Sequence, residues 1–245
     1  MDFAFMAETF VKLLEGVPLT LQLAFSSVAL GAVFAMGLAV MRMSGVTALD
    51  WMARGYVFVF RGTPLLVQIF LIYYGLGQFR PSLQAVGLWG FFREPYWCAL
   101  LGLTLNTAAY ASEIIRGGLQ SVPHGQIEAA KAAGMSGLLL FRRIVFPIAA
   151  RQALPGYGNE IILMVKATSL ASIITMMEVT GIAHKLISQT FRAIEVFVVA
   201  GAIYLFLNFL ITRAIMAIEW WLSPHLRNAP RSTPAQAPLI GAAHV

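Results

Sequence analysis

The chain has 245 residues, of which 59% are hydrophobic and 11% are charged, and its mean hydropathy is +0.76. These values lie outside the range of ordinary soluble domains, so most of the chain is expected to lie in a bilayer. The net charge of +6 comes from basic residues that border apolar segments. This placement indicates membrane topology and disfavours nucleic-acid binding.

The first 18 residues carry no basic region and no Ala-x-Ala cleavage pattern. They therefore predict a segment outside the membrane before a retained span, not a signal peptide. A span needs roughly 20 predominantly apolar residues, and the first is predicted over 19–41. Its Ser27, Gly31 and Ala35 recur every four residues, which favours close packing against another helix over a binding site.

A second span is predicted over 56–76, although Arg61 and Pro64 interrupt it. The loop that follows, 78–96, contains a run of aromatic residues typical of a segment in the outer membrane interface.

The third predicted span, 97–115, carries Asn106 and Thr107 and ends with Glu113. It is too polar for a helix that faces lipid on all sides, because buried polar groups need partners. At least one face is expected to meet protein or water.

An alanine-rich segment between the third and fourth spans predicts a compact helix from Pro123 to Ala133. Its residues are mostly strong helix formers, Pro123 suits a helix start, and Gly134 suits the left-handed position just past a helix end. A face of small side chains would let another surface approach the backbone closely. The segment is predicted to be a docking element.

The fourth predicted span, 154–177, has a second polar face. Its polar residues include Asn159, Glu160, Lys166, Thr168 and Ser169. Ionisable residues at membrane depth usually face a bundle interior or a pathway. For Glu160 the alternatives are an ion pair with Lys166 or a position in interfacial water.

The fifth span is predicted over 196–220, and the proline-containing tail 223–245 is expected to be disordered and cytoplasmic. Five spans place the termini on opposite sides of the membrane. Basic residues are more numerous in the loops after spans one, three and five, so the positive-inside rule puts the N-terminus outside and the alanine-rich helix in the cytoplasm.

The chain lacks a nucleotide-binding glycine loop, a His-Glu-x-x-His motif and a Cys-x-x-Cys motif, so no metal or cofactor is expected. Ser136 with His184 superficially suggests an intramembrane serine hydrolase. That alternative is disfavoured because Ser136 falls in a charged loop. Energy for any transport must come from another subunit.

Several motifs carry a resemblance to a known family. Glu128-Ala129-Ala130, Gly134 and Ile144-x-Phe146-Pro147 resemble the EAA loop of bacterial ABC importer permeases, here within about 116–150, with Phe146 replacing the usual Leu. The segments 61–68, 106–123 and 166–172 resemble the polar amino acid branch of those permeases. The resemblance covers about 16–221.

The resemblance implies an all-α membrane protein with the type I importer permease fold over 19–222. Within that branch, the chain most resembles the M-type permease subunits that serve histidine, lysine, arginine and ornithine, or the opines octopine and nopaline. Glu160 follows Asn159 where many glutamine-type relatives have glutamine. A carboxylate there would receive a cationic substrate group by a charge-assisted bond; the alternative is a permease for neutral polar amino acids such as glutamine.

The resemblance also implies partners and a location. They are a second permease subunit, related or identical, two cytoplasmic ATP-binding subunits that hold the ATPase activity, and a periplasmic substrate-binding protein, all at the bacterial inner membrane. The candidate pathway residues are Glu160, Asn159, Glu113, Asn106, Thr168 and Ser169. The candidate ATPase-coupling residues are Glu128, Ala129, Ala130, Gly134 and Pro147.

Overall fold

The computed structural model describes residues 2–222, and the regular elements in this part of the chain are all helices. The predicted tail 223–245 lies outside the described residues. The helices are α1 (Phe3–Leu14), α2 (Val17–Met43), α3 (Thr47–Gly62), α4 (Leu65–Phe70), α5 (Arg80–Ala85), α6 (Trp89–Phe92), α7 (Pro95–Gln120), α8 (His124–Ala132), α9 (Gly137–Leu140), α10 (Phe146–Ala167), α11 (Val179–Thr190) and α12 (Ala193–Leu222). Short π-helical turns continue α4 and α9, and a 3-10 helix, Thr168–Ile174, follows α10.

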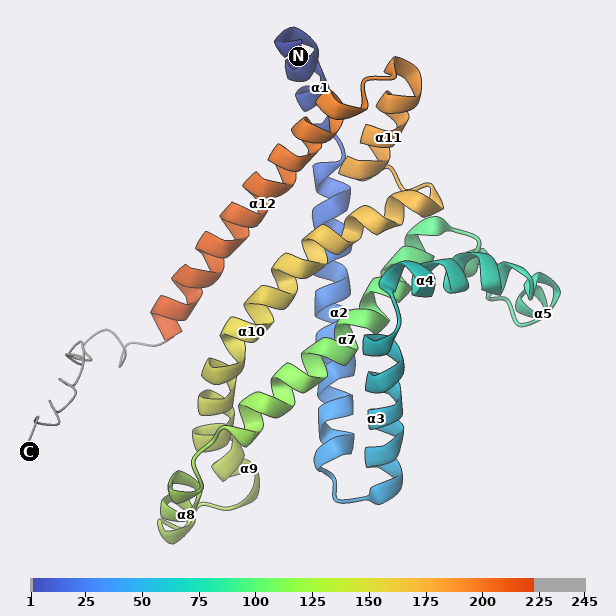
Figure 1. Cartoon of the computed structure of the whole chain (residues 1–245). Helices are drawn as coiled ribbons and strands as arrows, with labels where there is room; N and C mark the ends of the chain where they lie inside the picture. The colour runs from blue at the N-terminus through green and yellow to red at the C-terminus, as the bar shows by residue number, and fades with distance from the viewer. Residues whose placement is uncertain (1, 223–245) are drawn as a thin grey trace, which may run out of the picture.

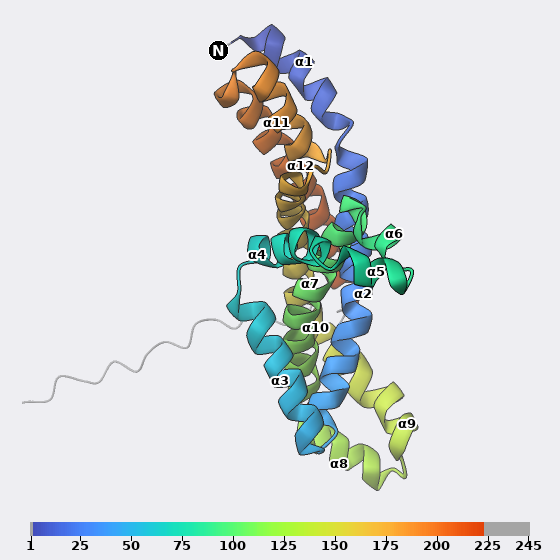
Figure 2. The ribbon, with the colours of Figure 1, turned by 90° about the vertical axis from the view of Figure 1, so that its right-hand side faces the viewer.

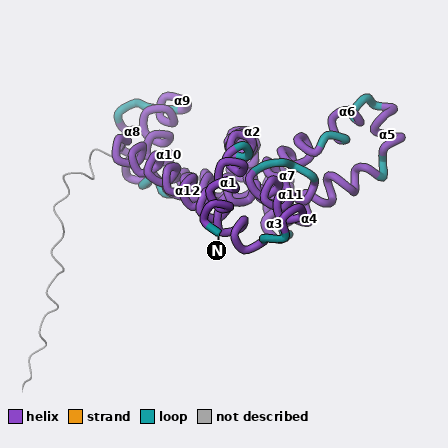
Figure 3. The backbone as a smooth tube through the Cα atoms, turned by 90° about the horizontal axis from the view of Figure 1, so that it is seen from above, coloured by secondary structure: helices purple, strands orange, loops and turns teal. Residues whose placement is uncertain are grey.

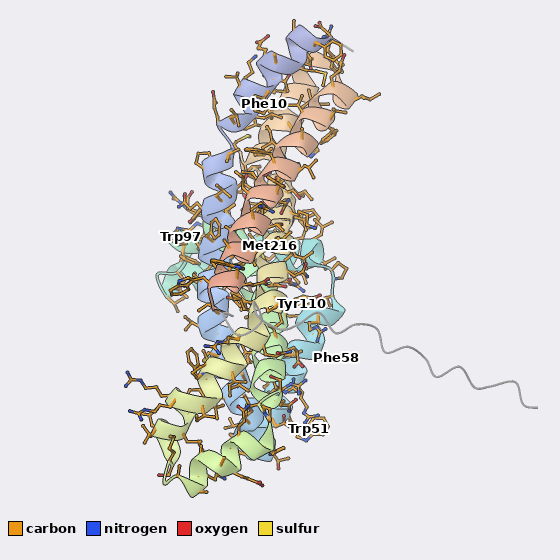
Figure 4. All side chains as sticks on the ribbon, turned by 90° about the vertical axis from the view of Figure 1, so that its left-hand side faces the viewer. Phe10, Trp51, Phe58, Trp97, Tyr110 and Met216 are labelled. Carbon is orange, nitrogen blue, oxygen red and sulfur yellow. The ribbon has the colours of Figure 1, made fainter. Side chains whose placement is uncertain are left out.

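The long helices α2, α7, α10 and α12 form an elongated bundle (Figure 1). One end holds α1 and α11, and the other holds α8, α9 and the turn between α2 and α3 (Figures 1 and 2). From above, α5 and α6 project from one side of the bundle (Figure 3). Large apolar side chains such as Phe58 and Met216 remain exposed on its outer surface (Figure 4), as expected where lipid replaces water.

Three helices in the described residues, α2, α7 and α12, are long and apolar enough to cross a membrane, and two bent pairs raise the number of candidate spans to five. The predicted five-span, all-α architecture therefore agrees with the structure, with one difference of shape. The second span is not one straight helix over 56–76, because the chain bends by 103° between α3 and the α4 segment.

The bend lies at Thr63 and Pro64. Proline has no N–H to donate and forces the preceding residue into an extended conformation, and Thr63 accordingly has φ −114° and ψ 144°. Pro155 has a different outcome, since α10 continues through it. The fourth span consequently begins earlier than the predicted residue 154.

The small-residue stripe of α2 packs as predicted. Ser27, Gly31 and Ala35 are all buried, and a β-carbon on Gly31 would collide with Thr107 of α7. The prediction of a helix–helix contact, rather than a binding site, is confirmed for this stripe.

The predicted alanine-rich helix is α8, and Pro123 stands immediately before it in an extended conformation. Gly134 has φ +82°, which confirms the left-handed position just past the helix end. Ala130 is buried against the chain, whereas Glu128 and Ala129 are exposed. One side of α8 is thus free for a partner.

Candidate substrate pathway

Polar side chains gather at three levels along the apolar bundle. Each level is built around one glutamate, namely Glu113, Glu160 and Glu178. Buried carboxylates need hydrogen-bond donors or cations, and the partners differ at each level. These differences indicate which level is open to a substrate.

At the middle level, Glu160 of α10 is only 5% exposed. Its Oε1 accepts a hydrogen bond of 2.7 Å from the Thr107 hydroxyl of α7. Its Oε2 accepts none from any residue between 2 and 222. Lys166 is exposed and forms no ion pair with Glu160, so the suggested Glu160–Lys166 pair is wrong.

Arg61 lies near the same level, in the last turn of α3. Its guanidinium stands 5.1 Å from the centre of the Tyr110 ring of α7, and Figure 4 places Tyr110 close to the middle of the molecule's length. Asn159, another candidate, is exposed beside Glu160.

Asn106 and Gln68 place two side-chain amides beside the α3–α4 bend, and we call this pair the amide bracket. The Asn106 amide donates to Gln68 Oε1 over 3.0 Å, and Gln68 Nε2 donates to the carbonyls of Phe60 at 2.9 Å and Thr63 at 3.1 Å. These carbonyls lose their helical partners at the bend, and the two amides replace them. Asn106 therefore has a structural task in addition to its predicted place in the pathway.

Glu113 belongs to an ionic cluster at the α8 end of the bundle. It accepts a hydrogen bond from Arg42 of α2 and forms a 2.7 Å salt bridge with Arg116 of α7. Arg42 Nε also lies 3.7 Å from Asp50 of α3. Arg42 and Arg116 therefore already balance the charge of Glu113. Together with Asp50, these residues connect α2, α3 and α7.

Glu178, which is fully buried, was missed by the sequence analysis. It precedes α11 and accepts hydrogen bonds from the backbone of Thr180 at 2.9 Å and Gly181 at 2.8 Å, and from the Tyr204 hydroxyl at 2.7 Å. An acidic residue placed just before a helix is the signal that would have found this cap.

The remaining candidates on the fourth span bond within their own helix. Thr168 donates to the carbonyl of Val165, and Ser169 donates to that of Lys166, at 2.8 and 2.7 Å. Thr168 is buried, and it lies between Glu160 and Glu178 in the chain.

The geometry rejects the hydrolase alternative. Ser136 precedes α9 and His184 lies on α11, and these helices stand at opposite ends of the bundle (Figure 1). His184 cannot act as a base for Ser136.

Comparison with known proteins identifies the family. The family model described as "binding-protein-dependent transport system inner membrane component" matches residues 19–222. The chain belongs to this family. The match covers α7, α10, α12 and all but the first two residues of α2, and it includes all three glutamate levels.

Its relatives are permease subunits. The permease is 63% identical to the octopine transport system permease protein OccM of Rhizobium radiobacter, over 93% of this chain and 92% of that one. It is 60% identical to the nopaline transport system permease protein NocM of Agrobacterium fabrum, over 93% and 94% of the two chains.

A solved structure agrees with this assignment. The crystal structure of an amino acid ABC transporter with histidines shares 34% identity and has a TM-score of 0.79, covering 89% of the permease and 98% of the matched chain. The protein is thus a permease subunit of an ABC importer with the type I fold. Among the three glutamates, Glu113 and Glu178 are engaged by several partners, whereas Glu160 has one hydroxyl donor.

Proposed function

We propose that this permease transports amino acids or opines that carry a cationic side chain, and that Glu160 receives that cation. The proposal rests on the burial of the Glu160 carboxylate and on its lack of a salt-bridge partner within residues 2–222. The carboxylate is buried at mid-bundle with one hydroxyl donor and no cation at salt-bridge distance among the described residues.

A buried carboxylate without a salt-bridge partner is unfavourable. A guanidinium or ammonium group from the substrate would supply that partner through a charge-assisted hydrogen bond. The names of the relatives support the same class, since octopine and nopaline both contain a cationic side chain and carboxylates.

The proposed orientation places the N-terminal residues 1–18 in the periplasm and α8 in the cytoplasm, with 19–222 as the membrane domain. The distribution of charge supports it. Arg54, Lys131, Arg142 and Arg143 belong to elements at the α8 end, where the α2–α3 turn also lies. Cytoplasmic loops carry such an excess of basic residues.

The proposed partners are a second permease subunit, two ATP-binding subunits and a periplasmic substrate-binding protein. The exposed side of α8, with Glu128 and Ala129, would dock in a cleft on an ATP-binding subunit. Closure of the ATP-binding pair would then move the helices as rigid bodies between outward-open and inward-open arrangements. Pro147 lies in the first turn of α10, which also carries Glu160, so one helix connects the end of the α8–α9 region to the level of Glu160.

The test of substrate class is uptake by a Glu160→Gln permease assembled with its partners, with octopine, nopaline, arginine and glutamine as competitors. The substitution keeps the shape and removes the charge. The preference for cationic substrates over glutamine is expected to fall roughly 10- to 100-fold, because a hydrogen bond to a charged group contributes about 1.5–3 kcal/mol.

The matched control is Glu15→Gln, an isosteric change at an exposed carboxylate outside the bundle. It should leave the preference unchanged. An unaltered preference in Glu160→Gln would overturn the proposal and leave the neutral amino acid alternative.

A further inference from the structure

We infer that Arg61 binds the carboxylate of the transported molecule, so that Arg61 and Glu160 together recognise a substrate with one anionic and one cationic end. This inference rests on the proposed function and adds a second specificity-determining residue to it.

Two opposite charges lie beside α7. Glu160 is fixed to Thr107, and Arg61 stands over Tyr110. Residues three apart in an α-helix lie on the same face, separated by about 4.5 Å along the axis. A carboxylate and a guanidinium therefore flank one face of α7, and both come from other helices.

The Arg61 guanidinium has N–H donors that no acceptor among residues 2–222 receives. It is exposed, and between residues 2 and 222 it makes a cation–π contact but neither a hydrogen bond nor a salt bridge. By contrast, Arg42 and Arg116 both bind Glu113. The position of Arg61 at the C-terminal end of α3 lets the helix dipole stabilise its positive charge. That interaction leaves the N–H donors of the guanidinium free to bind an acceptor.

A carboxylate would accept hydrogen bonds from these donors. Guanidinium presents two parallel N–H donors that match a carboxylate, and a charge at membrane depth needs a counter-charge. Amino acids and opines carry a carboxylate at a distance from their cationic end. Such a molecule would satisfy Arg61 and Glu160 at once.

The consequence is discrimination against molecules that have only one of the two ends. A molecule without the carboxylate would leave Arg61 unpaired, and a molecule without the cation would leave Glu160 unpaired. Sites with buried polar groups reject such analogues more strongly than apolar pockets reject small changes in size.

The experiment measures binding of radiolabelled arginine to the complete transporter complex in nanodiscs, with no substrate-binding protein present. Unlabelled arginine and agmatine, which is arginine without its carboxylate, compete. The unchanged complex should favour arginine over agmatine. Arg61→Gln should lower that ratio roughly 10- to 100-fold, and Arg61→Lys should lower it less, because lysine keeps the charge but not the paired donors.

The control is Arg213→Gln, which removes an exposed arginine from α12 and should leave the ratio unchanged. If Arg61→Gln does not assemble, Tyr110→Leu removes only the ring that holds the guanidinium and should also lower the ratio.

Three results would overturn the inference. They are an unchanged ratio in Arg61→Gln, an unchanged ratio in Tyr110→Leu where Arg61→Gln does not assemble, and no preference for arginine in the unchanged complex. The first of these results, combined with a lost cation preference in Glu160→Gln, would overturn the inference about Arg61 and leave the proposed function standing.

Discussion

The Cγ2 methyl group of Thr107 fills the space that a β-carbon on Gly31 would need. The hydroxyl of the same threonine donates to Glu160. The close approach of α2 to α7 therefore fixes the side chain that holds the mid-bundle carboxylate.

A Gly31→Ala substitution is expected to destabilise the permease by about 1–3 kcal/mol, since an added methyl group in a close-packed contact forces its neighbours apart. It should also weaken cation selectivity, because Thr107 is displaced. Thermal denaturation of the complex in nanodiscs and competition uptake measure the two effects.

Gly37→Ala is the matched control for this substitution, since a β-carbon there meets nothing within 4 Å. Thr107→Ser keeps the hydroxyl and removes the obstructing methyl group. The double variant Gly31→Ala with Thr107→Ser should recover stability, and failure to recover would contradict the proposed cause.

Gly134→Val is predicted to uncouple transport from ATP hydrolysis while the protein still inserts and assembles. Valine at φ +82° is strained, so the turn after α8 must change shape. The measurements are substrate-stimulated ATP hydrolysis and uptake. Gly87→Val creates comparable strain at φ +74°, in the turn between α5 and α6, and is expected to keep coupling. Normal stimulation in Gly134→Val would refute the role of α8.

Glu178 and Tyr204 are predicted to be energetically coupled. Glu178→Ala should destabilise by about 1–3 kcal/mol, because it removes a helix cap and leaves the hydroxyl of Tyr204 without this acceptor. Tyr204→Phe should lower the stability of the unchanged protein by less than Glu178→Ala does. In the Glu178→Ala background, Tyr204→Phe should lower it by still less. A double-mutant cycle on thermal stability measures the coupling, and strict additivity would show that the hydrogen bond contributes nothing.

The start of α1 should depend on pH. The pKa of the Asp2 carboxyl is lowered below its usual 3.8, mainly by the hydrogen bond from the backbone N–H of Phe5 and next by the hydrogen bond from the Arg192 side chain. The stabilisation is therefore complete above the ordinary pKa and is lost as the pH falls through the lower, folded-state pKa. Asp2→Asn should increase hydrogen exchange in the first turn of α1 at neutral pH. The difference from the unchanged chain should vanish below the folded-state pKa, and persistence there would contradict this assignment.

Much of the architecture could be predicted because lipid imposes a simple length rule. The apolar runs of α2, α7 and α12 were found directly, and α8 was found from Pro123 and Gly134. The bend at Pro64 was visible only as an interruption. Its angle depends on Gln68 and Asn106, whose partners come from residues up to 46 positions away, and local pattern does not encode such contacts.

The site was less predictable for a similar reason. Glu160 drew attention as an ionisable residue inside a span, but its hydroxyl partner is 53 residues away. Glu113 has the same residue type in the same kind of span and proved to be balanced by Arg42, across 71 residues. Only the arrangement of the helices distinguishes an engaged glutamate from an open one.

The amide bracket at the α3–α4 bend also constrains how the transporter can move. Gln68 and Asn106 hold the freed carbonyl of Phe60, so straightening the bend in lipid would strand polar groups without water to receive them. The corner therefore cannot act as a hinge. The corner would instead move as one rigid unit. Because Arg61 lies one residue from Phe60, such a motion would carry the Arg61 guanidinium with it. The distance between Arg61 and Glu160 would then differ between the outward-open and inward-open arrangements.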